Sequence, residues 1–187
     1  AAFNKIQKHF VENSRWGIPA IFTGEALHGI SGIRGTVFPI PLNFGATFDP
    51  ELGYQMGRAA AAEARARGIG ELFAPVMDLS RDPRYGRMEE NYGEDTYLAA
   101  EFARAGVRGL QGEDLSAPDA VAAEPKHFCA YGTPTGGLNC APCANSKHEV
   151  YSDHLPVFEA AYLEAGAMNA MCSYTAVDGT PVSMDRE

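Results

Sequence analysis

The sequence predicts an α/β fold in which short, fully buried strands alternate with helices. Four apolar runs recur along its 187 residues without polar alternation, a pattern typical of strands covered on both faces of a parallel sheet. Helix-like stretches with recognisable first and last residues separate these runs, and polar side chains follow each run at the same end. Together these observations predict consecutive strand–helix units.

The first predicted strand follows a polar, helix-like segment and lies between Gly17 and Gly24, and the second ends at Asp78. A fifth, shorter run is also a strand candidate. The five candidate strands are Ile18–Thr23, Pro41–Ala46, Leu72–Met77, Ala120–His127 and Gly166–Tyr174.

Three helices are predicted between the strands, over residues 52–67, about 95–110 and 152–166. Asp49 and Pro50 precede the first one as an N-cap and a proline at the first helical position, and Gly68 ends it. A long loop at residues 132–145, rich in Gly, Pro, Asn and Cys, precedes the last strand. Loops of this length are usually functional or disordered.

Units of this kind build either an open, doubly wound sheet or a (β/α)8 barrel of the TIM type. A nucleotide-binding open sheet would carry a glycine-rich fingerprint after its first strand, and none is present. A barrel carries functional side chains at the carboxyl ends of several strands, where this sequence places Glu25, His28, Asp78, Lys126-His127 and Tyr174. The barrel is therefore the expected fold.

A complete barrel takes about 250 residues. We therefore expect residues 1–187 to form an incomplete barrel domain that holds the first four to five strands. Half a barrel would expose strand edges and the inner faces of helices. For that reason we expect a C-terminal continuation or a companion polypeptide to supply the rest of the barrel, with a second domain also outside the chain.

Composition excludes several partners. The chain has 24 acidic and 15 basic side chains and a net charge of −9, which argues against nucleic acid because its binding needs clustered Lys and Arg. No run of 18 apolar residues exists to span a membrane. Residues 1–15 lack the apolar segment of a signal peptide, and the compartment is left open.

The cysteines raise the question of a metal. There are four, Cys129, Cys140, Cys143 and Cys172, too few for a disulfide scaffold. The Cys140–Cys143 pair has CxxC spacing and would need His127 and His148 to complete a zinc site; loop thiols or one local disulfide are the preferred interpretation. A metal-dependent hydrolase built on His28, Asp78, His127 and His148 would lack an HxH pair after the first strand. We expect no metal and no cofactor.

The residues at the strand ends suit a ligand that is rich in hydroxyl groups, such as a sugar. Carboxylates accept hydrogen bonds from vicinal hydroxyls, and Lys and Arg donate to the hydroxyl oxygens. A cation beside a histidine after a buried strand, as at Lys126-His127, is costly without a partner. The alternative interpretation is a set of salt bridges between strands at the barrel rim.

Five segments form a more specific pattern: GIPAIFTGEALHG (17–29), ATFDPEL (46–52), APVMDLSRDPRYGRMEENYGEDTYL (74–98), EPKHFCAYG (124–132) and MCSYTAVDGTP (171–181). In this order and spacing they closely resemble the N-terminal barrel domain of glycoside hydrolase family 3. RDPRYGR followed by GED, together with the Lys-His pair, is the most specific part. The resemblance covers nearly the whole chain, and the family includes exo-acting β-glucosidases, β-xylosidases and α-arabinofuranosidases.

The resemblance implies that five residues hold the terminal sugar: Glu25, Arg87, Lys126, His127 and Tyr174. Most members have Asp at the position of Glu25, and the longer Glu would narrow the pocket and favour a pentose. The other charged residues of the motifs are expected to fix loops to the barrel through ion pairs. These are Asp78, Arg81, Asp82, Arg84, Glu90 and Asp95.

The resemblance also implies retaining hydrolysis of an oligosaccharide or an aryl or alkyl β-glycoside by two carboxylates about 5–5.5 Å apart. The nucleophile Asp and the acid/base are expected beyond Glu187, so the chain would supply the sugar-binding part of subsite −1 and be inactive alone. The alternative is a non-catalytic sugar-binding fragment or half of a split protein.

One branch of the family, the N-acetylglucosaminidases, carries a histidine acid in an Asp-x-His motif. The segment Ser152-Asp153-His154 comes close to it, but residues 129–132 read Cys-Ala-Tyr-Gly where that branch has Pro-Gly-His-Gly. We therefore interpret Asp153 and His154 as first-turn residues of a helix.

Overall fold

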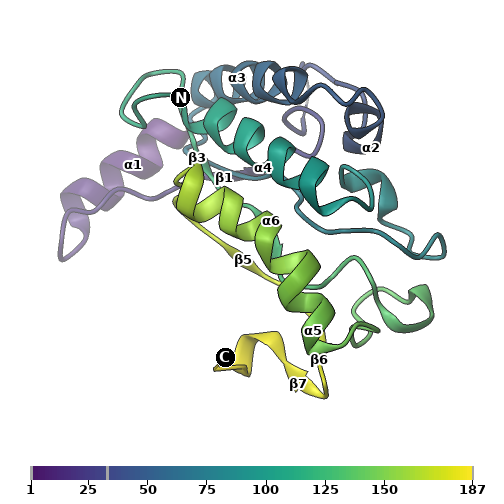
Figure 1. Cartoon of the computed structure of the whole chain (residues 1–187). Coiled ribbons are helices and arrows are strands. Elements are labelled where there is room, and N and C mark those ends of the chain that lie inside the picture. Colours follow the sequence, from purple (N-terminus) through teal and green to yellow (C-terminus); the bar gives the residue numbers. More distant parts are fainter. Residues whose placement is uncertain (1, 33, 187) are drawn as a thin grey trace.

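The computed structural model describes residues 2–32 and 34–186. Strands β1, β2 and β3 form a parallel sheet in that order, with Thr23 opposite Glu71 and Leu72 opposite Ala123. The chain continues from β3 into β4, which pairs in parallel with β5. The helices α3, α4 and α6 lie side by side over the strands (Figure 1). This arc of parallel strands with an outer helical layer is the partial (β/α)8 barrel that the sequence predicts.

The strands are β1 (Thr23–Glu25), β2 (Glu71–Phe73), β3 (Ala122–Ala123), β4 (Lys126–Phe128), β5 (Met171–Cys172) and the antiparallel hairpin β6 (Ala176–Val177) and β7 (Thr180–Pro181). The helices are α1 (Ala2–Asn13), α2 (Pro41–Gly45), α3 (Pro50–Ala66), α4 (Thr96–Gln111), α5 (Lys147–Glu149) and α6 (Leu155–Glu159). Two π-helical stretches, η3 (Val150–His154) and η4 (Ala160–Glu164), extend α5 and α6 into one continuous helical segment. Short 3-10 turns occur at η1 (Met88–Glu90), η2 (Thr135–Gly137) and η5 (Val182–Met184).

The strands are shorter than the apolar runs that predict them, for two local reasons. Near the first strand, the Gln7 side chain of α1 donates to the Ala20 carbonyl at 2.6 Å and accepts from its N–H at 2.8 Å, so that segment bonds to a side chain. Pro75 and Pro125 carry no backbone N–H. The ladder resumes beyond Pro75, where Val76 bridges to Lys126.

The predicted starts of two helices are confirmed. Asp49 is the N-cap of α3, where its carboxylate accepts from the Glu51 N–H at 3.1 Å, and Pro50 is the first helical residue. Asp95 caps α4 by accepting from the Leu98 N–H at 2.7 Å. It therefore acts as a helix cap, not as the ion-pair partner that the sequence analysis predicts.

Two predicted elements are wrong. The run at residues 41–46 is the short helix α2, because Pro41 at its first position has a backbone angle suited to a helix start. The last helical segment begins at Lys147, five residues before the predicted Ser152. Ser146 and Glu149 form a capping box there, in which each side chain bonds to the other's backbone. Asp153 and His154 consequently lie beyond the first turn.

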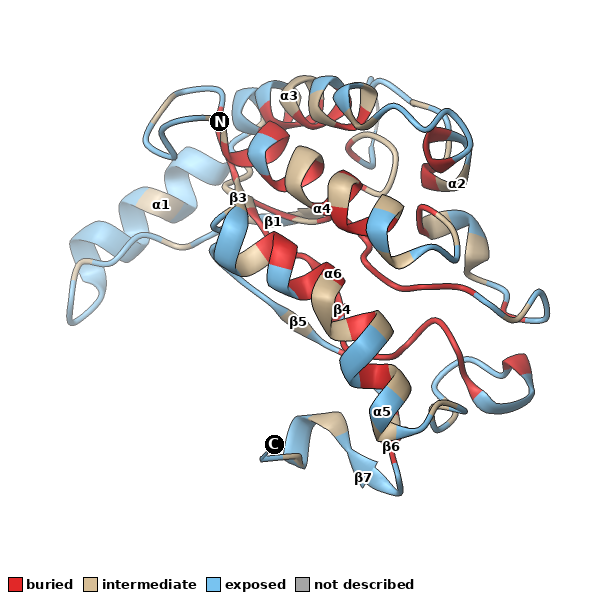
Figure 2. Ribbon diagram, in the orientation of Figure 1, coloured by how far each residue is buried: buried red, intermediate tan, exposed pale blue. Residues whose placement is uncertain are grey.

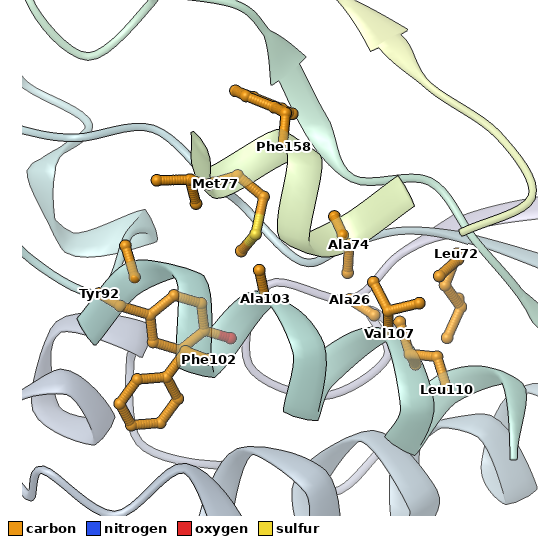
Figure 3. Packing of buried hydrophobic residues seen from close by; sticks show 14 of the residues in the cluster. Ala26, Leu72, Ala74, Met77, Tyr92, Phe102, Ala103, Val107, Leu110 and Phe158 are labelled. Atoms are coloured by element: carbon orange, nitrogen blue, oxygen red, sulfur yellow. The ribbon is translucent and has the colours of Figure 1, made fainter. Parts of the chain in front are cut away.

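The core lies between the helical layer and the strands. Tyr92 stacks on Phe102 with ring centroids 4.5 Å apart, Met77 lies toward them, and Leu72 lies at the other end of the cluster near Leu110 (Figure 3). Buried residues occur in β2, β3 and β4 and on the inner faces of α3, α4 and α6, whereas α1, β1 and the β6–β7 hairpin are mostly exposed (Figure 2). Within the described residues, no helix combines the length and apolar character that crossing a membrane requires.

Glycines bring α3 and α4 into close contact. A Cβ on Gly57 would lie 3.0 Å from the Gly109 backbone, and a Cβ on Gly109 would lie 2.5 Å from the Tyr54 carbonyl oxygen. The two helices therefore approach along a stripe that has no room for side chains. This contact fixes the loops that follow β1 and β2 relative to each other.

Candidate sugar-binding site

The last residue of β1 and the first residue of β4 form an ion pair in which only the lysine is buried. The Lys126 Nζ donates to the Glu25 Oε2 at 2.7 Å, and the Lys126 side chain is only 2% exposed while that of Glu25 is 47% exposed. A buried ammonium group loses much of its hydration, so the carboxylate offsets a cost that the lysine would otherwise carry alone.

His127 is held from two sides. Its Nδ1 lies 2.7 Å from the Asp78 Oδ2, and its backbone N–H donates to the Asp78 Oδ1 at 3.3 Å. Its Nε2 lies 3.2 Å from the Arg87 Nη2. A guanidinium group only donates hydrogen bonds, so Nε2 must present its lone pair to Arg87. The proton therefore resides on Nδ1, where it points at Asp78.

Arg87 is fixed by a two-pronged pair with Glu90. Its Nε and Nη2 donate to the two Glu90 oxygens at 2.7 and 2.8 Å. The turn η1 brings these residues together, three positions apart. The hydrogen bonds that Arg87 donates to Glu90 raise the pKa of Arg87 further above its ordinary value despite burial, so the guanidinium is charged at any physiological pH. Planar pairs of this kind also fix the direction of the remaining donors.

An aromatic group connects Arg87, His127 and Tyr174. The Tyr131 ring lies 4.7 Å from the His127 ring and 6.0 Å from the Tyr174 ring, and the Arg87 guanidinium carbon is 5.4 Å from its centroid. Tyr174 itself is 74% exposed. Tyr131 is a residue that sequence reasoning missed, although it lies within the EPKHFCAYG segment. An aromatic residue in a loop carries no signal of which side chains it will contact.

The other charged residues of the motifs mostly form ion pairs, as expected. Arg81 pairs with Asp153 and donates to the Glu94 carbonyl, and Asp82 pairs with Arg84 at 2.6 Å. Asp78 and Glu90, however, do more than fix loops, because each binds one of the predicted sugar-holding residues directly. The Arg81–Asp153 pair ties the loop after β2 to η3.

The residues weighed for other chemistries are engaged elsewhere. His28 Nδ1 lies 3.1 Å from the Phe38 carbonyl oxygen. His154 is buried, with no hydrogen-bond partner for its Nε2, and burial lowers its pKa. All four cysteines are free thiols, and nowhere within residues 2–32 and 34–186 do three or more metal-binding side chains gather. Burial raises the pKa of the Cys129 thiol to about 12, which keeps it protonated.

The structure brings the five predicted residues together in one chain of contacts. Glu25 binds Lys126, its neighbour His127 binds Arg87, and Tyr174 joins through Tyr131. Glu25 ends β1, Lys126 and His127 begin β4, and Arg87 lies in the loop after β2, so acceptor and donor groups from three segments come together here. This arrangement can serve vicinal hydroxyls, because each hydroxyl both donates and accepts hydrogen bonds. The exposure of Glu25 and Tyr174 leaves one side of the site open.

Comparisons with known proteins identify the family of this chain. The model of the glycosyl hydrolase family 3 N-terminal domain matches residues 1–187. A β-xylosidase from Formosa agariphila is 38% identical over 181 residues, which cover 92% of this chain and 25% of that protein. A periplasmic β-glucosidase from Salmonella typhimurium is 34% identical, covering 97% of this chain and 23% of its own length.

Solved structures give the same result. A β-glucosidase from Erythrobacter marinus superposes with a TM-score of 0.91 at 39% identity over 97% of this chain and 24% of that one. A Listeria innocua β-glucosidase variant in complex with laminaribiose gives 0.90 at 39% identity over 98% and 25%. The chain therefore spans about a quarter of the relatives it matches. Its sequence and its fold both place it in glycoside hydrolase family 3.

Proposed function

We propose that this chain is the sugar-binding part of subsite −1 in an exo-acting, retaining β-glycosidase of the β-glucosidase or β-xylosidase type. The observation that carries the proposal is that two contacts, Glu25 with Lys126 and Arg87 with His127, meet at consecutive residues of β4. Its relatives, which include proteins named β-glucosidase and β-xylosidase, support this substrate class. Binding a single terminal sugar in such a ring of donors and acceptors accounts for exo action.

In this proposal the two catalytic carboxylates are supplied from outside these 187 residues. Among the described residues, each carboxylate that contacts the site already has a cationic or imidazole partner: Glu25 with Lys126, Asp78 with His127, and Glu90 with Arg87. A nucleophile needs an oxygen that can reach the anomeric carbon, opposite an acid about 5–5.5 Å away. The nucleophile and the acid/base therefore come from a continuation beyond residue 187 or from a companion polypeptide, which also closes the barrel.

The test compares the gene product that contains these residues with the 187-residue chain alone. We expect the gene product to hydrolyse 4-nitrophenyl β-D-glucoside or β-D-xyloside, and NMR of the first-formed sugar to show the β-anomer. An α-anomer would refute the retaining mechanism. An intact mass spectrum shows whether the active material contains one polypeptide or two.

The isolated chain separates catalysis from binding. We expect it to show no turnover of either aryl glycoside, and measurable turnover by the purified chain would contradict the assignment of the chemistry to other polypeptide. The gene product itself could bind methyl β-glucoside or methyl β-xyloside and yet hydrolyse neither aryl glycoside. That result would favour the alternative, a non-catalytic sugar-binding protein.

Glu25 offers a test of which sugar is bound. Its carboxylate reaches one methylene further than an aspartate, while its Oε2 stays with the Lys126 Nζ at 2.7 Å. In the Glu25→Asp variant the space gained should favour a hexose over a pentose. We expect the ratio of kcat/KM for the aryl glucoside to that for the aryl xyloside to rise. A ratio that stays constant or falls would show that Glu25 does not set this preference.

A further inference from the structure

Tyr131 lies at the centre of the sugar-holding residues without being one of them. It is fully buried, at 0% exposure. Its ring contacts the His127 ring at 4.7 Å, the Tyr85 ring edge-on at 6.1 Å and the Arg87 guanidinium carbon at 5.4 Å. A buried ring that contacts several polar side chains of one site restricts the rotamers that those side chains can adopt.

The Tyr131 hydroxyl is held in turn by the loop at residues 132–145. It donates to the Asn139 Oδ1 at 2.8 Å and lies 3.3 Å from the Cys140 Sγ. Burial, followed by the contact with Cys140, raises the pKa of Tyr131 to about 12. The hydroxyl therefore keeps its proton, and its donor role toward Asn139, over the whole physiological pH range.

The loop is itself ordered enough to hold this hydroxyl. Its two ends pair, with the Ala144 N–H donating to the Thr133 carbonyl at 2.9 Å and the Thr135 N–H donating to the Pro142 carbonyl at 2.9 Å. Gly137 packs against the loop after β2, where an added Cβ would lie 2.5 Å from the Arg84 Cβ. The loop is therefore held by the pairing of its own ends and by its contact with the RDPRYGR segment.

We propose that Tyr131 is a positioning residue, which holds the His127 and Arg87 side chains for sugar binding and is itself oriented by the loop at residues 132–145. The expected effect of Tyr131 on catalysis rests on the proposed function. The expected effect of Tyr131 on the orientation of the His127 ring does not depend on the proposed function. The loop would then influence affinity for the sugar without touching it.

The test uses Tyr131→Leu, which removes the ring, and Tyr131→Phe, which removes only the hydroxyl. Tyr92→Leu is the matched control because Tyr92 is also buried but stacks on Phe102, away from the site. The first readout is the imidazole 15N spectrum of His127, assigned by replacing the five histidines in turn. The second is kcat and KM of the gene product for its aryl glycoside.

In Tyr131→Leu the Asp78 and Arg87 contacts of His127 remain possible, but the ring loses the packing that holds it against them, so we expect exchange broadening of the two His127 nitrogen signals. A misplaced group at the reacting sugar lowers kcat/KM by tenfold or more, so a loss of about tenfold is expected. Tyr92→Leu should change neither readout, and Tyr131→Phe should keep the tautomer. His127 signals in Tyr131→Leu as sharp as in the unchanged protein, or equal kinetic losses in Tyr131→Leu and Tyr92→Leu, would overturn the proposal.

The loop's part is tested by Asn139→Ala. Because Asn139 accepts the Tyr131 hydroxyl, this substitution and Tyr131→Phe remove the same hydrogen bond, so the double variant should lose no more activity than either single one. Additive losses would show that the loop does not act through Tyr131. If the gene product neither binds nor hydrolyses a glycoside, the proposed function fails, and the His127 spectrum still decides whether Tyr131 orients that ring.

Discussion

Replacing Asp78 with asparagine tests whether one buried carboxylate sets the tautomer of His127. Asp78 accepts two hydrogen bonds from the same residue, from Nδ1–H at 2.7 Å and from the backbone N–H at 3.3 Å. Asparagine has the same shape but offers one acceptor and one donor. In either amide orientation a donor faces a donor, unless the imidazole gives up its Nδ1 proton. That change would point Nε2–H at the Arg87 Nη2, 3.2 Å away.

The size of the effect follows from these contacts. Both Asp78 and His127 are buried, and a hydrogen bond to a charged group contributes about 1.5–3 kcal/mol to stability. The second bond is long, so we expect the free energy of unfolding to fall by about 2 kcal/mol, in the middle of that range. The His127 ring should also shift toward the Nε2–H tautomer. Sugar affinity should then fall, because Nε2 of His127 no longer accepts a hydrogen bond from Arg87.

The assay combines urea unfolding with the imidazole 15N spectrum. Asp82→Asn is the control, because Asp82 lies four residues later and pairs with the exposed Arg84, a kind of pair that contributes little. Its asparagine can still accept from the Arg84 N–H, so no measurable change is expected. Unchanged stability together with an unchanged Nδ1–H tautomer in Asp78→Asn would refute the reasoning.

Two further predictions concern stability. Burial, and then Arg81, lower the pKa of His154 below its ordinary value of 6.5, so the unfolded chain binds a proton there at a higher pH than the folded one. Stability should therefore decline as the pH falls below about 6.5, by at most about 1.4 kcal/mol per pH unit, and His154→Leu should flatten this decline in urea titrations; an equal slope in both proteins would contradict it. Gly109→Ala places a Cβ 2.5 Å from the Tyr54 carbonyl oxygen, so it should lower the melting temperature through overpacking of about 1–3 kcal/mol. Gly86→Ala, with nothing within 4 Å of its Cβ, should not, and comparable losses in both variants would count against close helix packing.

Elements whose signals are local were predictable. The N-cap Asp49 and the helix start near Asp95 were predicted, because caps act on N–H groups two or three residues away. The capping role of Asp95 itself was not predicted. The start of the last helical segment was missed because its capping box, Ser146 with Glu149, directly follows the predicted loop at residues 132–145 and precedes the apolar positions that predict the helix. The short helix α2 was missed because an apolar run of its length fits a strand as well as a helix.

In the candidate site, too, the local features were predictable from the sequence and the long-range contacts were not. The resemblance to glycoside hydrolase family 3 implied all five residues that the structure brings together. The strand-end argument alone indicated Glu25, Lys126-His127 and Tyr174, because polar side chains after buried strands end at one edge of a barrel. The sequence analysis assigned Asp78 and Glu90 only to loop fixing, since nothing in the RDPRYGR region says that they bind His127 and Arg87. Tyr131 was not singled out at all.

The sequence by itself determined the repeating strand–helix units, the first residues of α3 and α4, and the identity of the polar groups at the strand ends, because each depends on neighbours within a few positions. Only the tertiary structure decided which of those groups meet. Glu25 and Lys126 are 101 residues apart, and Asp78 and His127 are 49 apart. Their distances depend on strand pairing and on the glycine contact between α3 and α4, which no local pattern encodes. The tautomer of His127 and the central position of Tyr131 follow from that packing.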